Sequence, residues 1–139
     1  MPEAEARARL AGARVARLAT ADARGRPHVV PVTFAVDSGE NLIYIAIDHK
    51  PKTTTNLRRL RNIGENPAVS LLADYYSEDW AALWWARVDG RAIVMPVGAA
   101  QPGQPLDLLA AKYPQYRERR PDGPLIVIDA ERWTGWRSG

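Results

Sequence analysis

The chain has 139 residues, a formal net charge of +3, no cysteine and two histidines. This length suits one domain, 1–139, with its own hydrophobic core. The lack of cysteine excludes disulfides, thiolate metal sites and a cysteine nucleophile, and two histidines argue against a histidine-rich metal site. The small positive charge favours an acidic small molecule over nucleic acid as a partner. No apolar run approaches the roughly 18 residues of a membrane span, so we expect a cytoplasmic protein with no membrane partner.

In the first half of the chain, apolar periodicity predicts one helix followed by strands. The predicted order is helix 2–12, strand 13–20, turn 21–27, strand 28–36, hairpin turn 37–41 and strand 42–48. Alanines favour the helix, and alternating apolar and polar residues favour a half-buried strand after it. Pro31 interrupts the second strand, which therefore belongs at a sheet edge or at a bulge.

The second half combines further strands with short helices. The predicted order is helix 54–62, strand 68–74, an irregular or briefly helical connection 75–82, strand 83–94 turning near Asp89 and Gly90, loop 96–105, helix 106–113, and strand 124–129 with a second stretch at 132–137. Five to seven strands, joined mostly by tight turns and one main crossover helix, predict a mainly β fold of the antiparallel barrel type. A Rossmann domain is disfavoured because strands and helices do not alternate regularly and a glycine-rich fingerprint is missing.

The segment between the third strand and the second helix concentrates groups that bind anions. Lys50 and Lys52 flank Pro51, which stiffens the backbone between them. Thr53 or Thr54 can cap the helix and also donate to a phosphate oxygen, while the helix dipole adds positive charge. The segment predicts a phosphate site, and a solvated basic turn with a capping threonine is the alternative.

The second helix has a basic face made of Arg58, Arg59 and Arg61, which we expect to point away from its apolar stripe. Such a face is commonly just solvated. The functional alternative is that the arginines extend the anion site, because their planar guanidinium groups pair well with carboxylates and phosphates.

Adjacent tryptophans at Trp84 and Trp85 point to opposite faces of a strand, so one of them can line a flat ring while the other packs in the core. Core packing and a subunit interface are the alternative roles. We find no nucleophile motif and no convincing pair of acid and base, so no catalytic residue is assigned. A chain with few catalytic side chains and many ways to hold a ring and a phosphate is typical of a redox protein whose cofactor supplies the reaction.

Several segments occur in the order found in the pyridoxamine-phosphate-oxidase-like split β-barrel proteins, and the chain resembles that superfamily. The matching segments are 18–20, 25–32, 50–53, 57–59, 66–70 and 84–92. Within the superfamily, the lysine–threonine segment, the double arginine and the stretch 76–85 most resemble the actinobacterial branch that uses the deazaflavin coenzyme F420.

The resemblance implies an FMN-binding-like split β-barrel with a few short helices, acting as a homodimer with the cofactor in a groove at the subunit interface. The cofactor-binding residues that it implies are Lys50, Lys52, Thr53 and Thr54 near the phosphate, His28, Pro31, Ala46 and Ile47 near the ring, Arg58 and Arg59 near an acidic tail, and Trp84 and Trp85 from a later strand.

The implied activity is an F420H2-dependent reductase that transfers a hydride between the deazaflavin and a small organic acceptor, with no metal. One alternative is an FMN-dependent oxidase or reductase of the same fold. Another is a non-catalytic protein that binds or stores F420. Nucleic-acid binding through the arginine helix is disfavoured by the small net charge.

Overall fold

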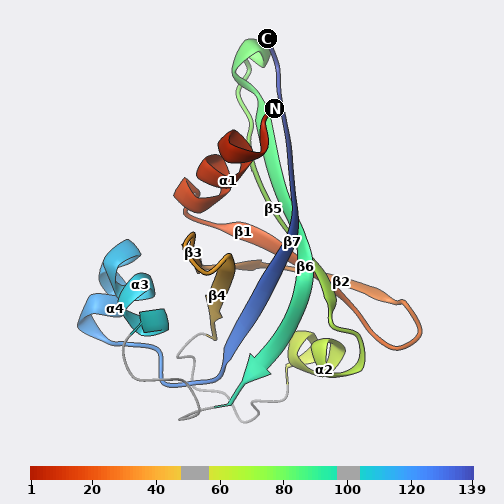
Figure 1. Ribbon diagram of the computed structural model, residues 1–139, viewed down its shortest axis with the longest axis vertical. Helices are drawn as coiled ribbons and strands as arrows, with labels where there is room; N and C mark the ends of the chain where they lie inside the picture. Colours follow the sequence, from red (N-terminus) through yellow and green to blue (C-terminus); the bar gives the residue numbers. More distant parts are fainter. Residues whose placement is uncertain (48–56, 97–103) are drawn as a thin grey trace.

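The computed structural model describes residues 1–47, 57–96 and 104–139 (Figure 1). Its elements in chain order are α1 (Glu3–Gly12), β1 (Ala16–Ala21), β2 (Pro27–Val32), β3 (Phe34–Asp37), β4 (Leu42–Ala46), α2 (Arg58–Glu65), β5 (Ala68–Tyr75), the 3-10 helix η1 (Trp80–Ala82), β6 (Trp84–Met95), α3 (Gln104–Lys112), α4 (Pro114–Glu118) and β7 (Leu125–Arg137). Over the described ranges, no helix combines the length and the apolar character that crossing a bilayer requires.

The described strands form one antiparallel sheet of seven in the order β2-β1-β5-β6-β7-β4-β3. The long strands β6 and β7 run along most of the molecule, and the sheet curls around them (Figure 1). Helix α1 packs against β6 and β7, α2 against β1 and β6, and α3 against β3. The predicted mainly β, antiparallel architecture with a few short helices is confirmed.

The strand predicted over 28–36 is wrong as one element, because it divides at Thr33 into β2 and β3. β2 pairs with β1 and β3 pairs with β4, and these two strands lie at opposite ends of the strand order. The expected edge position of Pro31 is confirmed, since β2 is an edge strand and a proline there removes no ladder hydrogen bond on its outer side.

The turn predicted near Asp89 and Gly90 is also wrong, because β6 continues through both residues, and the register shift between them leaves Glu131 of β7 as the extra residue of a bulge. Gly90 lies directly against the carbonyl oxygen of Asp129 on β7, an approach that only a residue without a Cβ allows. β7 likewise runs without a break from Leu125 to Arg137, since β6 pairs with it along nearly its whole length. Helix α4 was not predicted.

Helix α2 begins four residues later than predicted. Its N-cap is Leu57, whose φ of −71° and ψ of 146° are extended and whose side chain makes no capping hydrogen bond. The capping role predicted for Thr53 or Thr54 is therefore wrong, and those two residues lie outside the described ranges. The helix ends at Glu65, and it buries Ile63 in the core.

The core has two parts that share the strands β4 and β7. The part inside the curled sheet includes Leu18, Phe34, Ile43, Ile45, Leu71, Val88, Ile126 and Ile128. The part beneath α3 and α4, which we call the α3–α4 unit, includes Ala35, Tyr44, Ala46, Leu109, Tyr113, Tyr116, Leu125 and Val127. Because successive side chains alternate between faces, β4 and the first four residues of β7, 125–128, are buried on both sides, which explains their unbroken apolar sequences.

Lys112, the last residue of α3, is a half-buried cation in the α3–α4 unit. Its Nζ lies 3.7 Å from the ring centroid of Phe34 and 5.3 Å from that of Tyr113, and no described residue accepts a hydrogen bond from it. Burial, with a smaller contribution from Arg14, lowers the pKa of Lys112 from 10.5 to about 8. The aromatic faces offset part of the cost of desolvating the ammonium group.

We expect the free energy of unfolding of the wild type to rise relative to that of Lys112→Met between about pH 7.5 and about pH 9.5. In this window the unfolded lysine, with a pKa of 10.5, binds more protons than the folded lysine, with a pKa of about 8, so the folded wild type gains stability as the pH rises. A shift of this size gives about 2 kcal/mol over the window, which screening by water at a half-exposed group reduces to about 1 kcal/mol. Urea denaturation at both pH values measures the difference, and a constant difference would contradict the buried charge.

Candidate functional site

Three of the predicted cofactor residues meet at one small cavity of about 190 Å³. Its lining residues are Val15, Pro31, Val32, Thr33, Ala46 and Arg59, and we call it the β2–β4 cavity. Pro31 comes from β2, Ala46 from the end of β4 and Arg59 from the first turn of α2. Arg59 is half-buried and lines this cavity, whereas Leu60 and Ile63 of the apolar stripe line a different groove.

Contacts to the first part of the sheet hold α2 beside β2. Asn62 is buried and donates from Nδ2 to Oγ1 of Thr20 on β1, at 3.0 Å. Glu65 accepts a hydrogen bond from the backbone N–H of Ala23 in the turn between β1 and β2, at 2.9 Å. Ile63 adds an apolar anchor in the core. These contacts place the first turn of α2 near the end of β4.

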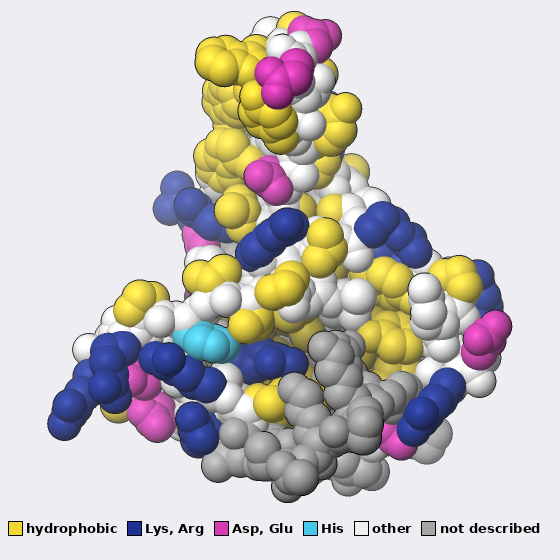
Figure 2. Space-filling view, turned by 180° about the vertical axis from the view of Figure 1, so that it is seen from behind, with side chains coloured by type: hydrophobic (Ala, Val, Ile, Leu, Met, Phe, Trp, Pro, Cys, Tyr) yellow, Lys and Arg dark blue, Asp and Glu magenta, His cyan; other side chains and the backbone are white. Residues whose placement is uncertain are grey.

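The first turn of α2 is strongly positive. It contains Arg58 and Arg59 and has no acidic residue, although a helix N-terminus already presents partial positive charge. Basic side chains are unfavourable at this end of a helix unless an anion is nearby. Figure 2 shows Lys and Arg side chains gathered on one face of the molecule, beside the histidine coloured cyan. The first turn of α2 is therefore electrostatically suited to an anionic ligand.

His28 on β2 belongs to the same positive region. Burial first, and then the charges of Arg58 and Arg59, lower the pKa of His28 below its ordinary value, which favours the neutral imidazole. Its Nδ1 is buried and has no hydrogen-bond partner among the described residues. A buried polar atom without a partner is costly in a native protein, and a bound ligand is one physical explanation for it.

A second, polar cavity of about 350 Å³ lies on the other side of the first turn of α2. Its lining residues are Asp22, Arg26, Arg58, Arg61, Asn62 and Glu65, and we call it the α2 polar cavity. The Asp22 carboxylate is already engaged by the Arg26 side chain at 2.7 Å and by the backbone N–H groups of Arg24 and Arg26. The adjacent residues Arg58 and Arg59 thus connect the α2 polar cavity to the β2–β4 cavity.

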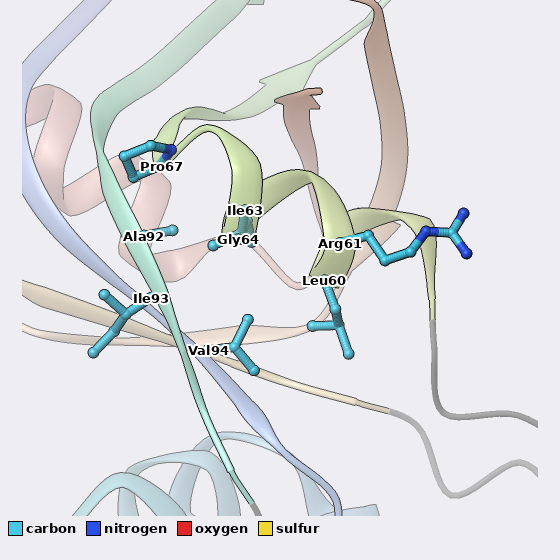
Figure 3. A pocket seen from close by; sticks show the side chains of 8 residues that line it. All are labelled: Leu60, Arg61, Ile63, Gly64, Pro67, Ala92, Ile93 and Val94. Atoms are coloured by element: carbon cyan, nitrogen blue, oxygen red, sulfur yellow. The ribbon is translucent and has the colours of Figure 1, made fainter. Parts of the chain in front are cut away.

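An apolar groove of about 640 Å³ separates α2 from β6 (Figure 3). Its lining residues are Leu60, Arg61, Ile63, Gly64, Pro67, Ala92, Ile93 and Val94. The guanidinium of Arg61 points away from the groove, so its walls present almost no polar group (Figure 3). A specific small-molecule site needs a few convergent polar groups to orient its ligand, and the β2–β4 cavity meets that requirement better.

The structure does not bring Trp84 and Trp85 to the β2–β4 cavity. They begin β6 at the end of the molecule where α1 and both termini lie (Figure 1). Their rings are on opposite faces, since Trp84 stacks with Arg9 of α1 at 5.2 Å and Trp85 stacks with Arg87 at 5.7 Å. Among the other predicted residues, Ile47 is half-buried against the core, and Lys50, Lys52, Thr53 and Thr54 lie outside the described ranges.

Sequence reasoning missed three residues of the β2–β4 cavity. Val15 and Val32 resemble ordinary core residues, and their sequence context contains no signal of a site. Thr33 had a weak signal, because a single polar residue between two apolar β-branched stretches breaks the strand pattern.

The β2–β4 cavity has a chemistry that suits one edge of a planar cofactor. Of the six described residues that line it, four are apolar, while Thr33 offers a hydroxyl and Arg59 a guanidinium. Its volume is below the roughly 300–1,000 Å³ of typical small-molecule sites. A flavin-sized ligand would therefore extend beyond the cavity, with anionic groups favoured near the first turn of α2.

Solved structures that share the fold come from several bacteria. A conserved hypothetical protein of Mycobacterium tuberculosis superposes with a TM-score of 0.73 at 21% identity, covering 99% of this chain and 85% of that one. A FAD-binding protein of Mesorhizobium loti superposes with a TM-score of 0.71 at 22% identity, covering 97% of this chain and 94% of that one. The haem storage protein of Vibrio cholerae superposes with a TM-score of 0.67 at 21% identity, covering 91% of this chain and 87% of that one. At this identity the likeness establishes the split β-barrel fold.

The family comparison covers almost the whole chain. The family model described as pyridoxamine 5'-phosphate oxidase matches residues 2–137. A comparison with curated proteins gives no significant match. The match includes the strands and the helix that build the β2–β4 cavity, and the chain therefore belongs to the pyridoxamine 5'-phosphate oxidase family.

Proposed function

We propose that this chain is an oxidoreductase that binds coenzyme F420 and transfers a hydride between the deazaflavin and a small organic acceptor. The observation that supports the proposal best is the convergence of Pro31, Ala46 and Arg59 on one cavity next to the positive first turn of α2. The FAD-binding protein of Mesorhizobium loti, which shares the fold, supports a ligand with a flavin-type ring. The arginines favour F420, whose acidic tail carries more negative charge than FMN does.

In this proposal the chain binds and orients, and the cofactor supplies hydride transfer when it is bound. Pro31 and Ala46 provide an apolar wall for the ring edge, and Arg59 holds a negative group at the cavity mouth. Arg58, in the α2 polar cavity, takes an acidic part of the ligand farther from the ring. Lys50 and Lys52 remain proposed phosphate contacts.

We also propose a homodimer whose subunits share each cofactor groove. The β2–β4 cavity alone is too small for a complete cofactor. Trp84 and Trp85 lie at the opposite end of β6 from it. Tyr76 and Trp80 next to them are 62% and 67% exposed, which is typical of an unpaired interface. A molecular mass of 15.4 kDa in solution, which is that of a single chain, would contradict the proposed homodimer.

The proposal is tested by titrating the purified protein with F420, FMN and haem while following quenching of tryptophan fluorescence. We expect saturable F420 binding that is tighter than FMN binding, because Arg58 and Arg59 add charge-assisted contacts. Tighter FMN binding would replace the proposal with the FMN-dependent alternative. Haem binding alone would reject both, and would match the function in the name of the Vibrio cholerae fold relative. Binding of F420 without oxidation of F420H2 by any acceptor would indicate storage.

A further inference from the structure

A pair of hydroxyl groups connects the β2–β4 cavity to the α3–α4 unit. Thr33, between β2 and β3, lines the cavity. Its Oγ1 lies 2.7 Å from the phenolic oxygen of Tyr116 on α4, and either atom can be the donor. The two residues are 83 positions apart in the chain. A buried element that looks purely structural therefore reaches the wall of the candidate site.

The position of Tyr116 is determined by packing. It is only 8% exposed, and its ring contacts that of Tyr113 edge to face, with centroids 5.5 Å apart. The hydroxyl of Tyr113 accepts a hydrogen bond from the backbone N–H of Phe34 at 3.2 Å and donates to the carbonyl oxygen of Arg14 at 2.9 Å. Tyr113 thus docks α3 against the backbone at Arg14 and Phe34, next to the cavity residues Val15 and Thr33.

A threonine hydroxyl has one donor and two acceptor positions. The contact with Tyr116 uses one of these and restricts the rotation of the Thr33 side chain. The remaining hydrogen-bonding capacity belongs to a side chain in a cavity where the other lining residues that the structure describes are apolar, apart from Arg59. In such a wall a single oriented hydroxyl discriminates strongly between ligands with and without a polar edge.

We infer that Thr33 is a ligand-binding residue that hydrogen-bonds the polar edge of the bound ring, at a carbonyl oxygen or a ring nitrogen, and that Tyr116 is a positioning residue that orients the Thr33 hydroxyl. This inference rests on the proposed function, since it requires a planar cofactor ring in the β2–β4 cavity. It gives α3 and α4 a role in ligand selection, although no residue of these two helices lines the cavity.

The test measures F420 and FMN dissociation constants and the visible absorption spectrum of the bound ring for the wild type and four variants. Thr33→Val should weaken binding about fivefold, because one neutral hydrogen bond is lost. Thr33→Ser keeps the hydroxyl and should stay within about twofold of the wild type. Tyr116→Phe should weaken binding about threefold and shift the absorption maximum in the same direction as Thr33→Val, which a purely structural role would not do.

Tyr113→Phe is the matched control, because it removes one phenol from the same unit without a contact to Thr33. We expect it to lower the melting temperature and leave both dissociation constants and the absorption maximum unchanged. If the wild type binds neither ring, the proposed function and this inference both fail. If the wild type binds but Thr33→Val matches it in affinity and spectrum, this inference alone is overturned. If Tyr116→Phe alone matches the wild type, the positioning role is overturned.

Discussion

Arg59→Gln should weaken binding of F420 and FMN by a factor of about 10 to 100, with little change in the fold. Arg59 is the only charged residue among the six described residues that line the β2–β4 cavity. It also lies at the positive end of α2, so its charge and the helix dipole act on the same anionic group of the ligand. A charge-assisted hydrogen bond in a partly buried site contributes about 1.5–3 kcal/mol, which corresponds to this change in affinity.

Two further variants separate charge from geometry. Arg59→Lys keeps the charge but loses the planar guanidinium, so its affinity should fall between those of the wild type and Arg59→Gln. Arg91→Gln removes an equal charge from an exposed position on β6 that lines none of the described cavities around α2. It should bind as the wild type does. If Arg59→Gln and Arg91→Gln weaken binding equally, a general effect of net charge explains the loss, and Arg59 has no specific role.

The sequence predicted the strand content and the antiparallel class because these depend on local patterns. Alternating residues in β1 and β5, turn residues after β1, and Pro31 at a sheet edge all act over a few positions. The register shift opposite Gly90 and the unbroken course of β7 depend instead on pairing between distant strands. Local propensity is outweighed there by tertiary contacts, which one sequence does not reveal.

The candidate site was predicted in part for the same reason. Pro31, Ala46 and Arg59 were named from the resemblance, and they do come together, but the start of α2 was placed too early. An N-cap of Leu57 has no capping side chain, so the usual sequence signal for a helix start is missing. The contact between Thr33 and Tyr116 spans 83 positions and follows from the docking of α3 and α4. Such contacts depend on the complete fold.

The close approach of Gly90 to β7 leads to the prediction with the largest effect on stability. Gly90→Ala should destabilise the protein by about 3 kcal/mol or more, and it would leave much of the protein unfolded if the wild type is only marginally stable. A Cβ at this position would collide with the carbonyl oxygen of Asp129 and would lie 3.0 Å from Cγ2 of Ile128. The backbone oxygen is held in the β6–β7 pairing, so the clash is relieved only by displacing one of the two strands that span the sheet.

Gly64→Ala is the matched control, because it adds the same methyl group in α2 where no atom lies within 4 Å. Alanine favours a helix over glycine by about 0.5–1 kcal/mol, so this variant should be as stable as the wild type or slightly more stable. Urea unfolding followed by tryptophan fluorescence compares the three proteins, since Trp133 is buried against the same sheet. Equal midpoints for Gly90→Ala and Gly64→Ala would mean that β6 and β7 can separate at the bulge without cost, and the close approach at Gly90 would then have no role in holding the sheet together.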